Sequence, residues 1–388
     1  MNHIAFQNAI ATEAGLYLEH LQKIVEMESP SHDPGLLNQV ADAIISDWQA
    51  IGIGCDEIQN EAGAKHLRLK WMPAVVSDQL KPWLVVGHFD TVWPVGTLAK
   101  MPFRREGDQV AGPGTYDMKA DLVLAWLTAR QMLTMGIMPS RPVVFLFTCD
   151  EETGSHSSRE LIEREARNAN AALVLEPPLA SGALKTARKG VGCYRIDITG
   201  RSAHAGVEPE KGRSAITELA RQILKIQSAA APELGTTINI GKIAGGTANN
   251  VVAEKAWCEI DVRVSSMEEA ARIDAFFKNE ILPFDQDIRL EVTGGLNRPP
   301  MVRSSAAGKL FEFCREVAAG LGVSLEEGAT GGGSDGNFTA AVGCPTIDGL
   351  GLEGAGAHAP HEHINISSLP LRAALLAAIL TSEMQLTD

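Results

Sequence analysis

The sequence lacks long apolar runs, CxxC pairs and an excess of basic residues. Without about 20 consecutive apolar residues, a membrane-spanning helix is not expected. The beginning of the chain has no basic stretch followed by an apolar core, so it does not resemble a signal peptide. The six cysteines are scattered, at positions 55, 149, 193, 258, 314 and 344. This pattern is typical of reduced thiols, and we expect a cytoplasmic protein.

Basic side chains are the minority among the charged residues. The chain has 34 Lys and Arg against 48 Asp and Glu, which gives a formal net charge of -14. An acidic surface is not drawn to nucleic acid or to an anionic membrane, and we expect neither as a partner. With 388 residues and 45% hydrophobic content, the chain can form a large core, and its length favours two domains over one.

Three continuous apolar runs predict buried parallel strands, at residues 83–90, 143–152 and 171–177, and each ends in histidine or acidic residues. Apolar residues at helical spacing follow the first run at 120–133, and a polar helix is predicted at 157–168. The alternation of strand and helix indicates an α/β fold with a mainly parallel central sheet. Ligands bind such sheets beyond the carboxyl ends of the strands.

The middle of the chain follows a different pattern. Apolar and polar residues alternate at 192–200 and at 257–264, which is typical of antiparallel strands with one face in water. Amphipathic helices are predicted at 213–227 and 266–282. A small α+β domain is therefore predicted within a larger one. The larger domain is formed by residues 1–185 and 296–388, and the inserted one by residues 186–295.

Imidazole and carboxylate side chains gather at the predicted strand ends and in the loops beside them. They are His88, Asp90, Asp117, Glu151, Glu152, Glu176 and His358. Taken singly, each acid is compatible with a solvated turn. Taken together in one buried place, they would repel one another without cations. A dinuclear metal site resolves this repulsion because these ligand types suit zinc and similar divalent ions, and paired metals fit the attack of water on a carbonyl.

Seven motifs carry a family resemblance: GHFDTV, GPGTYDMKAD, DEETGS, LEP, GRSAHAG, GGTANNVVAE and GAGAHAPHE. Their order resembles that of the M20 family of dinuclear zinc peptidases and deacylases, and most closely its glutamate carboxypeptidase (carboxypeptidase G2-like) branch. The resemblance covers about residues 84–370. It implies a zinc-peptidase-like catalytic domain and an inserted, ferredoxin-like lid or dimerisation domain.

The resemblance also implies the metal ligands. His88 and Glu176 would hold one metal, and Glu152 and His358 would hold the other. Asp117 would bridge the two. Two divalent ions per chain are therefore expected, with zinc as the first choice and cobalt or manganese as alternatives.

Two catalytic roles follow from the same resemblance. Asp90 would orient the neighbouring imidazole, and Glu151 would be the general base. Among the clustered histidines, His358 is preferred as ligand to His361 because the family places the ligand a few residues before a glutamate.

Three residues of the inserted domain are expected to meet the substrate. In the family this domain pairs two subunits, so we expect a homodimer formed through residues 186–295. His204 would reach the partner's active site and stabilise the oxyanion. Asn250 and Arg263 would hold a substrate carboxylate, a task that suits the guanidinium fork.

Three other features have plainer interpretations. Asp121 stands where the family usually has a small residue, and we expect it in the first turn of a helix, where the dipole favours an acid. Cys149 lies in an apolar strand and is expected to pack in the core. The glycines at 330–337 lack the pattern of a nucleotide-binding loop.

The predicted function is metal-dependent hydrolysis of an amide bond next to a free carboxylate. The substrate would be a peptide or an N-acyl amino acid, and the most specific expectation is release of a C-terminal glutamate. Alternatives on the same site are a deacylase of acetyl- or succinyl-amino acids and a dipeptidase. A catalytically silent relative that binds amino acids is a further alternative, but neither Glu151 nor a metal ligand is lost. A purely structural protein would leave the acidic cluster unexplained.

Overall fold

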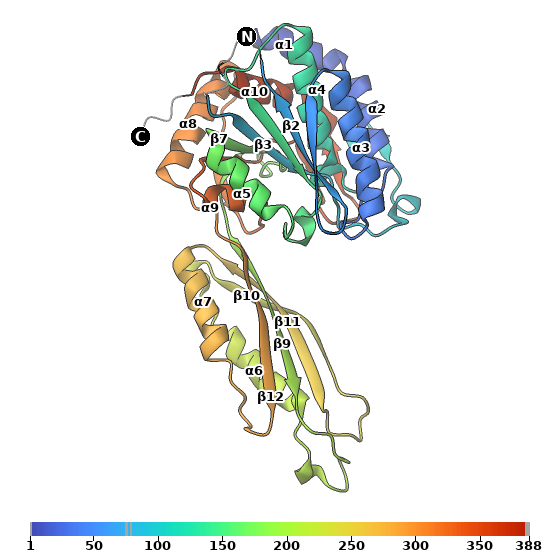
Figure 1. The fold of residues 1–388 in the computed structure, drawn as a ribbon, viewed down its shortest axis with the longest axis vertical. Coiled ribbons are helices and arrows are strands. Elements are labelled where there is room, and N and C mark those ends of the chain that lie inside the picture. Colours follow the sequence, from blue (N-terminus) through green and yellow to red (C-terminus); the bar gives the residue numbers. More distant parts are fainter. Residues whose placement is uncertain (1, 74–76, 78–79, 385–388) are drawn as a thin grey trace. The chain divides into compact units, whose positions relative to one another are not determined.

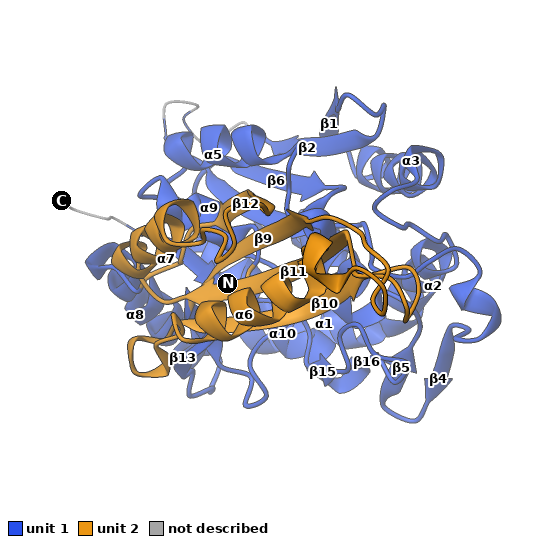
Figure 2. Cartoon of the chain, turned by 90° about the horizontal axis from the view of Figure 1, so that it is seen from below, with its two compact units in different colours: residues 1–187, 303–330, 334–388 blue, residues 188–302, 331–333 orange. Residues whose placement is uncertain are grey.

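The computed structural model describes residues 2–73, 77 and 80–384. The chain divides into two compact units, coloured blue and orange in Figure 2. Unit 1 comprises Met1–Ala187, Arg303–Thr330 and Ser334–Asp388, and unit 2 comprises Arg188–Val302 and Gly331–Gly333. The sequence predicts boundaries after residues 185 and 295, whereas the units change after residues 187 and 302. The assignment of Gly331–Gly333 to unit 2 was not predicted.

Unit 1 is built on an eight-stranded sheet with the order β1-β2-β6-β3-β7-β14-β8-β13. Its four central strands run parallel, with β3 between β6 and β7, and β14 beside β7. They are β6 (Val143–Thr148), β3 (Trp83–His88), β7 (Ala171–Val174) and β14 (Thr346–Asp348). Three of them coincide with the apolar runs, so the predicted α/β class with a mainly parallel centre is confirmed.

The outer strands of this sheet depart from the parallel pattern. β1 (Gly54–Gln59) pairs antiparallel with β2 (Lys65–Trp71), which pairs antiparallel with β6. β8 (Leu184–Arg188) and β13 (Glu327–Thr330) complete the other side. A second sheet, which the sequence did not predict, has the order β15-β16-β5-β4. Its strands are β15 (Gly354–Ala355), β16 (His363–Asn365), β5 (Gln109–Ala111) and β4 (Arg104–Glu106).

Helices cover both faces of the large sheet, as Figure 1 shows. Alternate side chains of each strand point to opposite faces. On β3, Val85 joins the larger core cluster, whereas Leu84 and Val86 join the smaller one. The larger cluster contains residues of α1 (His3–Thr12), α2 (Ala14–Val25), α3 (Pro34–Ala50), α4 (Ala120–Thr134), α8 (Ser305–Gly320) and α10 (Leu369–Thr381). The smaller contains residues of α5 (Arg159–Asn168) and α9 (Gly336–Ala341).

Unit 2 is a ferredoxin-like α+β unit. Its four strands are antiparallel, in the order β10-β11-β9-β12, and its two helices pack on the buried face. Ser214 and Ser266 cap the first turns of these helices with their side chains. The elements run β9 (Gly190–Thr199), α6 (Ala215–Gln227), β10 (Thr237–Gly245), β11 (Lys255–Val264), α7 (Met267–Asn279) and β12 (Arg289–Arg298). The inserted α+β fold is thereby confirmed.

Two expectations from composition concern cysteines and membranes. All six cysteines are free thiols, and Cys149, Cys258, Cys314 and Cys344 are buried. Burial raises the pKa of Cys149, which fits its expected place in the core. Within the described part of the chain, no helix combines the length and the apolar character that crossing a membrane requires. The cytoplasmic location stays a prediction.

Candidate active site

The five predicted metal ligands come together at the carboxyl edge of the parallel strands. His88 is the last residue of β3, Glu152 lies in the turn after β6, and Glu176 follows β7. Asp117 belongs to the short helical segment Thr115–Lys119 that leads into α4. His358 lies in the loop between β15 and β16. The ends of three parallel strands, the segment before α4 and the loop between β15 and β16 thus deliver these side chains to one place.

Asp117 stands between the two histidines. One carboxylate oxygen, Oδ1, lies 3.2 Å from Nε2 of His88, and the other, Oδ2, lies 3.2 Å from Nε2 of His358. Glu176 approaches the first imidazole, with Oε1 at 3.6 Å from His88 Nε2. Glu152 approaches the second, with Oε2 at 3.1 Å from His358 Nε2. The carboxylate of Asp117 therefore joins two groups of ligands through its two oxygens.

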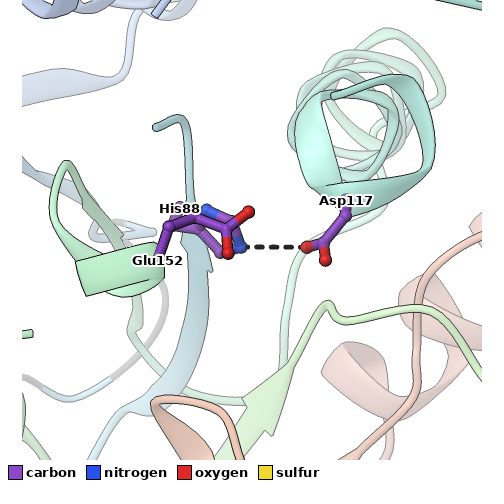
Figure 3. A group of neighbouring side chains, drawn as sticks. All are labelled: His88, Asp117 and Glu152. Atoms are coloured by element: carbon purple, nitrogen blue, oxygen red, sulfur yellow. Dashed lines mark hydrogen bonds and ion pairs between the residues drawn. The ribbon is translucent and has the colours of Figure 1, made fainter. Parts of the chain in front are cut away.

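The spacing of these atoms fits divalent metal ions. Ligand atoms arranged as a tetrahedron around zinc are about 3.3 Å apart, given zinc–ligand distances of about 2.0–2.2 Å. The observed separations of 3.1–3.6 Å bracket this value. His88, Asp117 and Glu152 also have ligand atoms within 4.8 Å of one another, and Figure 3 shows these three side chains converging. By their types and spacing, these side chains form a candidate metal-binding group.

The electrostatics of the cluster favour added positive charge. Hydrogen bonds with Asp117 and Glu152 raise the pKa of His358 to about 11. Burial would lower the pKa of His88, but hydrogen bonds with Asp117 and Asp90 raise it well above its usual range. Burial also raises the pKa of Glu152 to about 7. A divalent cation would supply the positive charge that these carboxylates attract.

Asp90 is fully buried and holds both sides of the site. Its backbone oxygen lies 3.1 Å from Nδ1 of His88, and its carboxylate Oδ1 lies 3.3 Å from the same atom. The two carboxylate oxygens also accept the backbone N–H groups of Glu151 and Glu152, at 3.2 and 3.1 Å. Asp90 can thus orient the imidazole and, at the same time, fix the turn that carries the two glutamates.

The acidic triplet after β6 is divided between two tasks. Asp150 points to the start of α5, where its Oδ2 accepts the backbone N–H and the hydroxyl of Ser157, both at 2.7 Å. Burial opposes its ionisation, but hydrogen bonds with Ser158 and Ser157 lower the pKa of Asp150. Glu152 belongs to the cluster around Asp117, as described above. Asp150 therefore stabilises a helix start.

The loop of the second histidine has an unusual backbone. His358 has φ = 60°, a left-handed backbone conformation that residues other than glycine rarely adopt. Such conformations concentrate at functional sites, where the surrounding structure enforces them. The structure places His358, and not His361, beside Asp117 and Glu152; the nearby His363 lies on β16 with its Nδ1 2.8 Å from the backbone oxygen of His361.

The three residues predicted to meet the substrate all lie in unit 2. His204 is exposed and forms a β-bridge with Val251, and the backbone N–H of Ala205 donates to the oxygen of Asn250 at 2.9 Å. The loops of His204 and Asn250 are therefore neighbours. Arg263 lies on β11, where its Nε and Nη2 both donate to the carboxylate of Asp261 at 2.8 Å. One edge of the guanidinium is thus already paired with an acid.

The sequence did not indicate two buried acids near these ligands. Asp335 of the glycine-rich loop accepts the hydroxyl of Ser155 and, at 3.0 Å, that of Thr148, and so fastens the turn after β6. Glu362 is the glutamate that follows His358 in the family motif, and it accepts the backbone N–H groups of Tyr116 and Asp117. Glu362 ends the quoted motif GAGAHAPHE, and Asp335 lies in the glycine-rich segment 330–337. An acid within a glycine-rich or histidine-rich motif was the signal that could have revealed them.

Asp121 lies in the first turn of α4, as predicted, but it is fully buried. Its Oδ1 accepts the backbone N–H of Leu352 at 2.7 Å. Burial raises the pKa of Asp121 well above its usual range. In addition to its place in the first turn of α4, Asp121 therefore forms a buried hydrogen bond within unit 1.

An α/β fold with imidazoles and carboxylates so arranged at its strand ends defines a class, the metal-dependent hydrolases. The sequence profile of Peptidase family M20/M25/M40 matches residues 84–382, and the chain belongs to this family. It is an M20-type metallohydrolase, and the family implies metal dependence.

Individual relatives agree with this assignment. Carboxypeptidase G2 from Pseudomonas sp. (strain RS-16) is 29% identical over 401 residues, which cover 98% of this chain and 92% of that protein. Succinyl-diaminopimelate desuccinylase from Delftia acidovorans (strain DSM 14801 / SPH-1) is 25% identical over 380 residues, 91% and 94% of the two chains. The crystal structure of aminopeptidase PepT from Bacillus cereus ATCC 10987 shares the fold, with a TM-score of 0.75, 24% identity and coverage of 97% and 98%.

Proposed function

We propose that this enzyme hydrolyses an amide bond next to a free carboxylate and releases a C-terminal glutamate from an N-acyl or peptidyl substrate. The observation that carries the proposal is the place of Asp117, whose two oxygens face two different histidines at 3.2 Å. Similarity to carboxypeptidase G2 over 98% of the chain supports the carboxypeptidase chemistry.

In this proposal two groups of side chains hold the metals. His88 and Glu176 form one group, His358 and Glu152 form the other, and Asp117 belongs to both. Two divalent ions held there, with zinc as the first choice, would supply Lewis acidity for attack on the amide carbonyl.

Glu151 is the proposed general base. The backbone N–H groups of Glu151 and of the proposed ligand Glu152 both donate to the carboxylate of Asp90. These bonds fix the backbone from which the Glu151 side chain extends. Its carboxylate takes a proton from the water that attacks the carbonyl carbon. The C–N bond then breaks, and the same proton passes to the leaving amine. The products are a carboxylic acid and a free amino acid.

Unit 2 supplies the proposed recognition of the substrate carboxylate. Arg263 and Asn250 carry donors that suit a carboxylate, and Arg263 lies on the polar face of β11. Asp261 occupies its Nε and Nη2, and Nη1 donates to the backbone oxygen of Gly331 at 3.4 Å, so the bound carboxylate would use the second N–H of Nη1 or displace one of these partners. Asn250 would add the donor of its side-chain amide.

A homodimer formed through unit 2 is part of the proposal. Among the described strands, β10 pairs only with β11, so one of its edges is available to another strand. Ile243 on β10 and Leu224 on α6 are 61% and 71% exposed. Exposed apolar side chains next to a strand edge favour association with a second copy, by which His204 would stabilise the oxyanion in the partner's site.

Mixed dimers test the role of His204. A His204→Ala subunit lacks the oxyanion donor, and a Glu151→Gln subunit lacks the base, so each homodimer should be inactive. A heterodimer of the two has one site with both groups, and we expect activity to return in part when the subunits are mixed and exchanged. The measurement is turnover of the mixture against each parent.

Heterodimer formation must be demonstrated separately, with subunits that carry different tags. Mixing two samples of His204→Ala provides the control for subunit exchange without complementation. Proven heterodimers that show no more turnover than their parents would rule out a site shared between subunits.

A deacylase of succinyl- or acetyl-amino acids is the second candidate function. It is favoured by the similarity to succinyl-diaminopimelate desuccinylase over 91% of the chain. The same base and metal groups would serve both reactions, because each cleaves an amide next to a carboxylate. The choice between them depends on whether the pocket fits a C-terminal glutamate or an acetyl or succinyl group.

Metal content and product release test the proposed function directly. We expect about two metals per chain by mass spectrometry, as in dinuclear hydrolases. We also expect zinc-dependent release of glutamate from an N-acyl glutamate or a folate-like amide. Two metals with release only from acetyl- or succinyl-amino acids would favour the deacylase. No metal after reconstitution with zinc, cobalt or manganese would refute the proposal.

A further inference from the structure

Glu362 is a fully buried glutamate that receives four hydrogen bonds. Its Oε1 accepts the backbone N–H groups of Tyr116 and Asp117, at 2.9 and 3.1 Å. Its Oε2 accepts the indole N–H of Trp93 at 2.8 Å and the backbone N–H of Gly114 at 3.1 Å. All four partners are donors, and each oxygen has two of them. A carboxylate is the side chain that satisfies such a set, because both of its oxygens only accept.

These four bonds converge on segments that carry the metal ligands. Two of the donors are the backbone N–H of Asp117 itself and that of the residue before it. A third, Trp93, lies in the loop that follows β3, three residues after Asp90. Glu362 therefore fixes the backbone of Asp117, and with it the position of the Asp117 carboxylate.

Glu362 is also joined closely to His358. Backbone hydrogen bonds run from Ala359 to Gly356 at 2.8 Å and from Glu362 to Ala359 at 2.9 Å, and they close the loop between the histidine and the glutamate. Glycine is required at position 356, where φ is 85° and a Cβ would lie 2.9 Å from the backbone nitrogen of Glu362. The position of Glu362 thus sets that of the second histidine.

We propose that Glu362 is a positioning residue. It fixes the Asp117 segment relative to the His358 loop, so that the proposed ligands of the dinuclear site are in place before metal binds. It is not one of the proposed metal ligands or substrate-binding residues. Charge-assisted hydrogen bonds to backbone N–H groups are strong and directional, which suits a fixed frame. The inference rests on the metal ligands proposed above, and it adds that their spacing depends on this one carboxylate.

The test replaces Glu362 by Gln in the full chain. Because donors meet both oxygens of Glu362, the amide NH₂ of Gln must face two N–H groups in either orientation. We expect zinc affinity, measured by competition with a chromophoric chelator, to fall about 10- to 100-fold, as for other residues that orient metal ligands. In the metal-free protein, hydrogen exchange of the peptide containing residues 114–117 should become faster.

Glu218 offers a matched control in unit 2. It is also buried, but both of its donors, Nε2 of Gln222 and the backbone N–H of Phe284, meet the same oxygen. Gln at this position can keep both bonds, so Glu218→Gln should leave zinc affinity unchanged. An equal loss of zinc affinity in this control would overturn the positioning role, since any buried charge would then have the same effect.

A milder variant covers the case in which Glu362→Gln does not fold. Trp93→Phe removes only the indole donor, and it should weaken zinc binding in the same direction by a smaller factor. Unchanged zinc affinity and unchanged exchange in the folded variants would overturn the inference while leaving the proposed function intact. A wild-type protein that takes up no zinc would instead refute the proposed function.

Discussion

Glu151→Gln should abolish hydrolysis while the metals remain bound. We expect turnover to fall by a factor of about 10² to 10⁴, the usual contribution of a general base, because the amide cannot accept the proton of the attacking water. The metal groups around Asp117 are complete without Glu151, and its backbone bond to Asp90 does not involve the side chain. Turnover and metal content, measured on the same sample, give the result.

Glu152→Gln is the matched control because it changes the adjacent glutamate in the same way. Its carboxylate lies 3.1 Å from His358 Nε2, so this variant should lose metal as well as activity. Near-normal turnover of Glu151→Gln would show that another group removes the proton. Loss of metal from Glu151→Gln would instead make this residue a ligand.

The parts of the fold that the sequence predicted are those that depend on burial patterns. Continuous apolar runs such as 143–148 have both faces covered in the structure, and alternating runs such as 257–264 have one. Both patterns follow from the environment of the side chains alone. The gathering of His88 and Glu176 could be foreseen for a related reason, because parallel strands bring their carboxyl ends to the same edge.

The small sheet beside the site could not be predicted in this way. β15 has two residues, and β4, β5 and β16 have three each, which is too short to show a period. These strands are defined by backbone hydrogen bonds between distant segments, such as β16 with β5. Tertiary context decides such pairings, and local sequence does not display it.

The division of labour among the acids was hidden for a similar reason. Asp150 and Glu152 are two residues apart, yet one accepts N–H groups at the start of α5 and the other faces His358. The partners of Asp150 and Glu362 are mostly backbone N–H groups, and every residue other than proline has one. The letters of a sequence therefore show which acids are present but not which of them the backbone will satisfy.

Asp117→Asn should dismantle the dinuclear site. Asn keeps one oxygen and replaces the other with an NH₂ group, which cannot bind a metal, so the side chain can face only one of the two histidines as a ligand. We expect metal content to fall from about two per chain to one or fewer, with loss of hydrolysis. Asp121→Asn is the control: burial raises the pKa of Asp121, and the amide oxygen of Asn can still accept the N–H of Leu352, so metal content should not change. If Asp117→Asn retained both metals at wild-type affinity, the carboxylate would not bridge them, and the arrangement of its oxygens between two imidazoles would need another explanation.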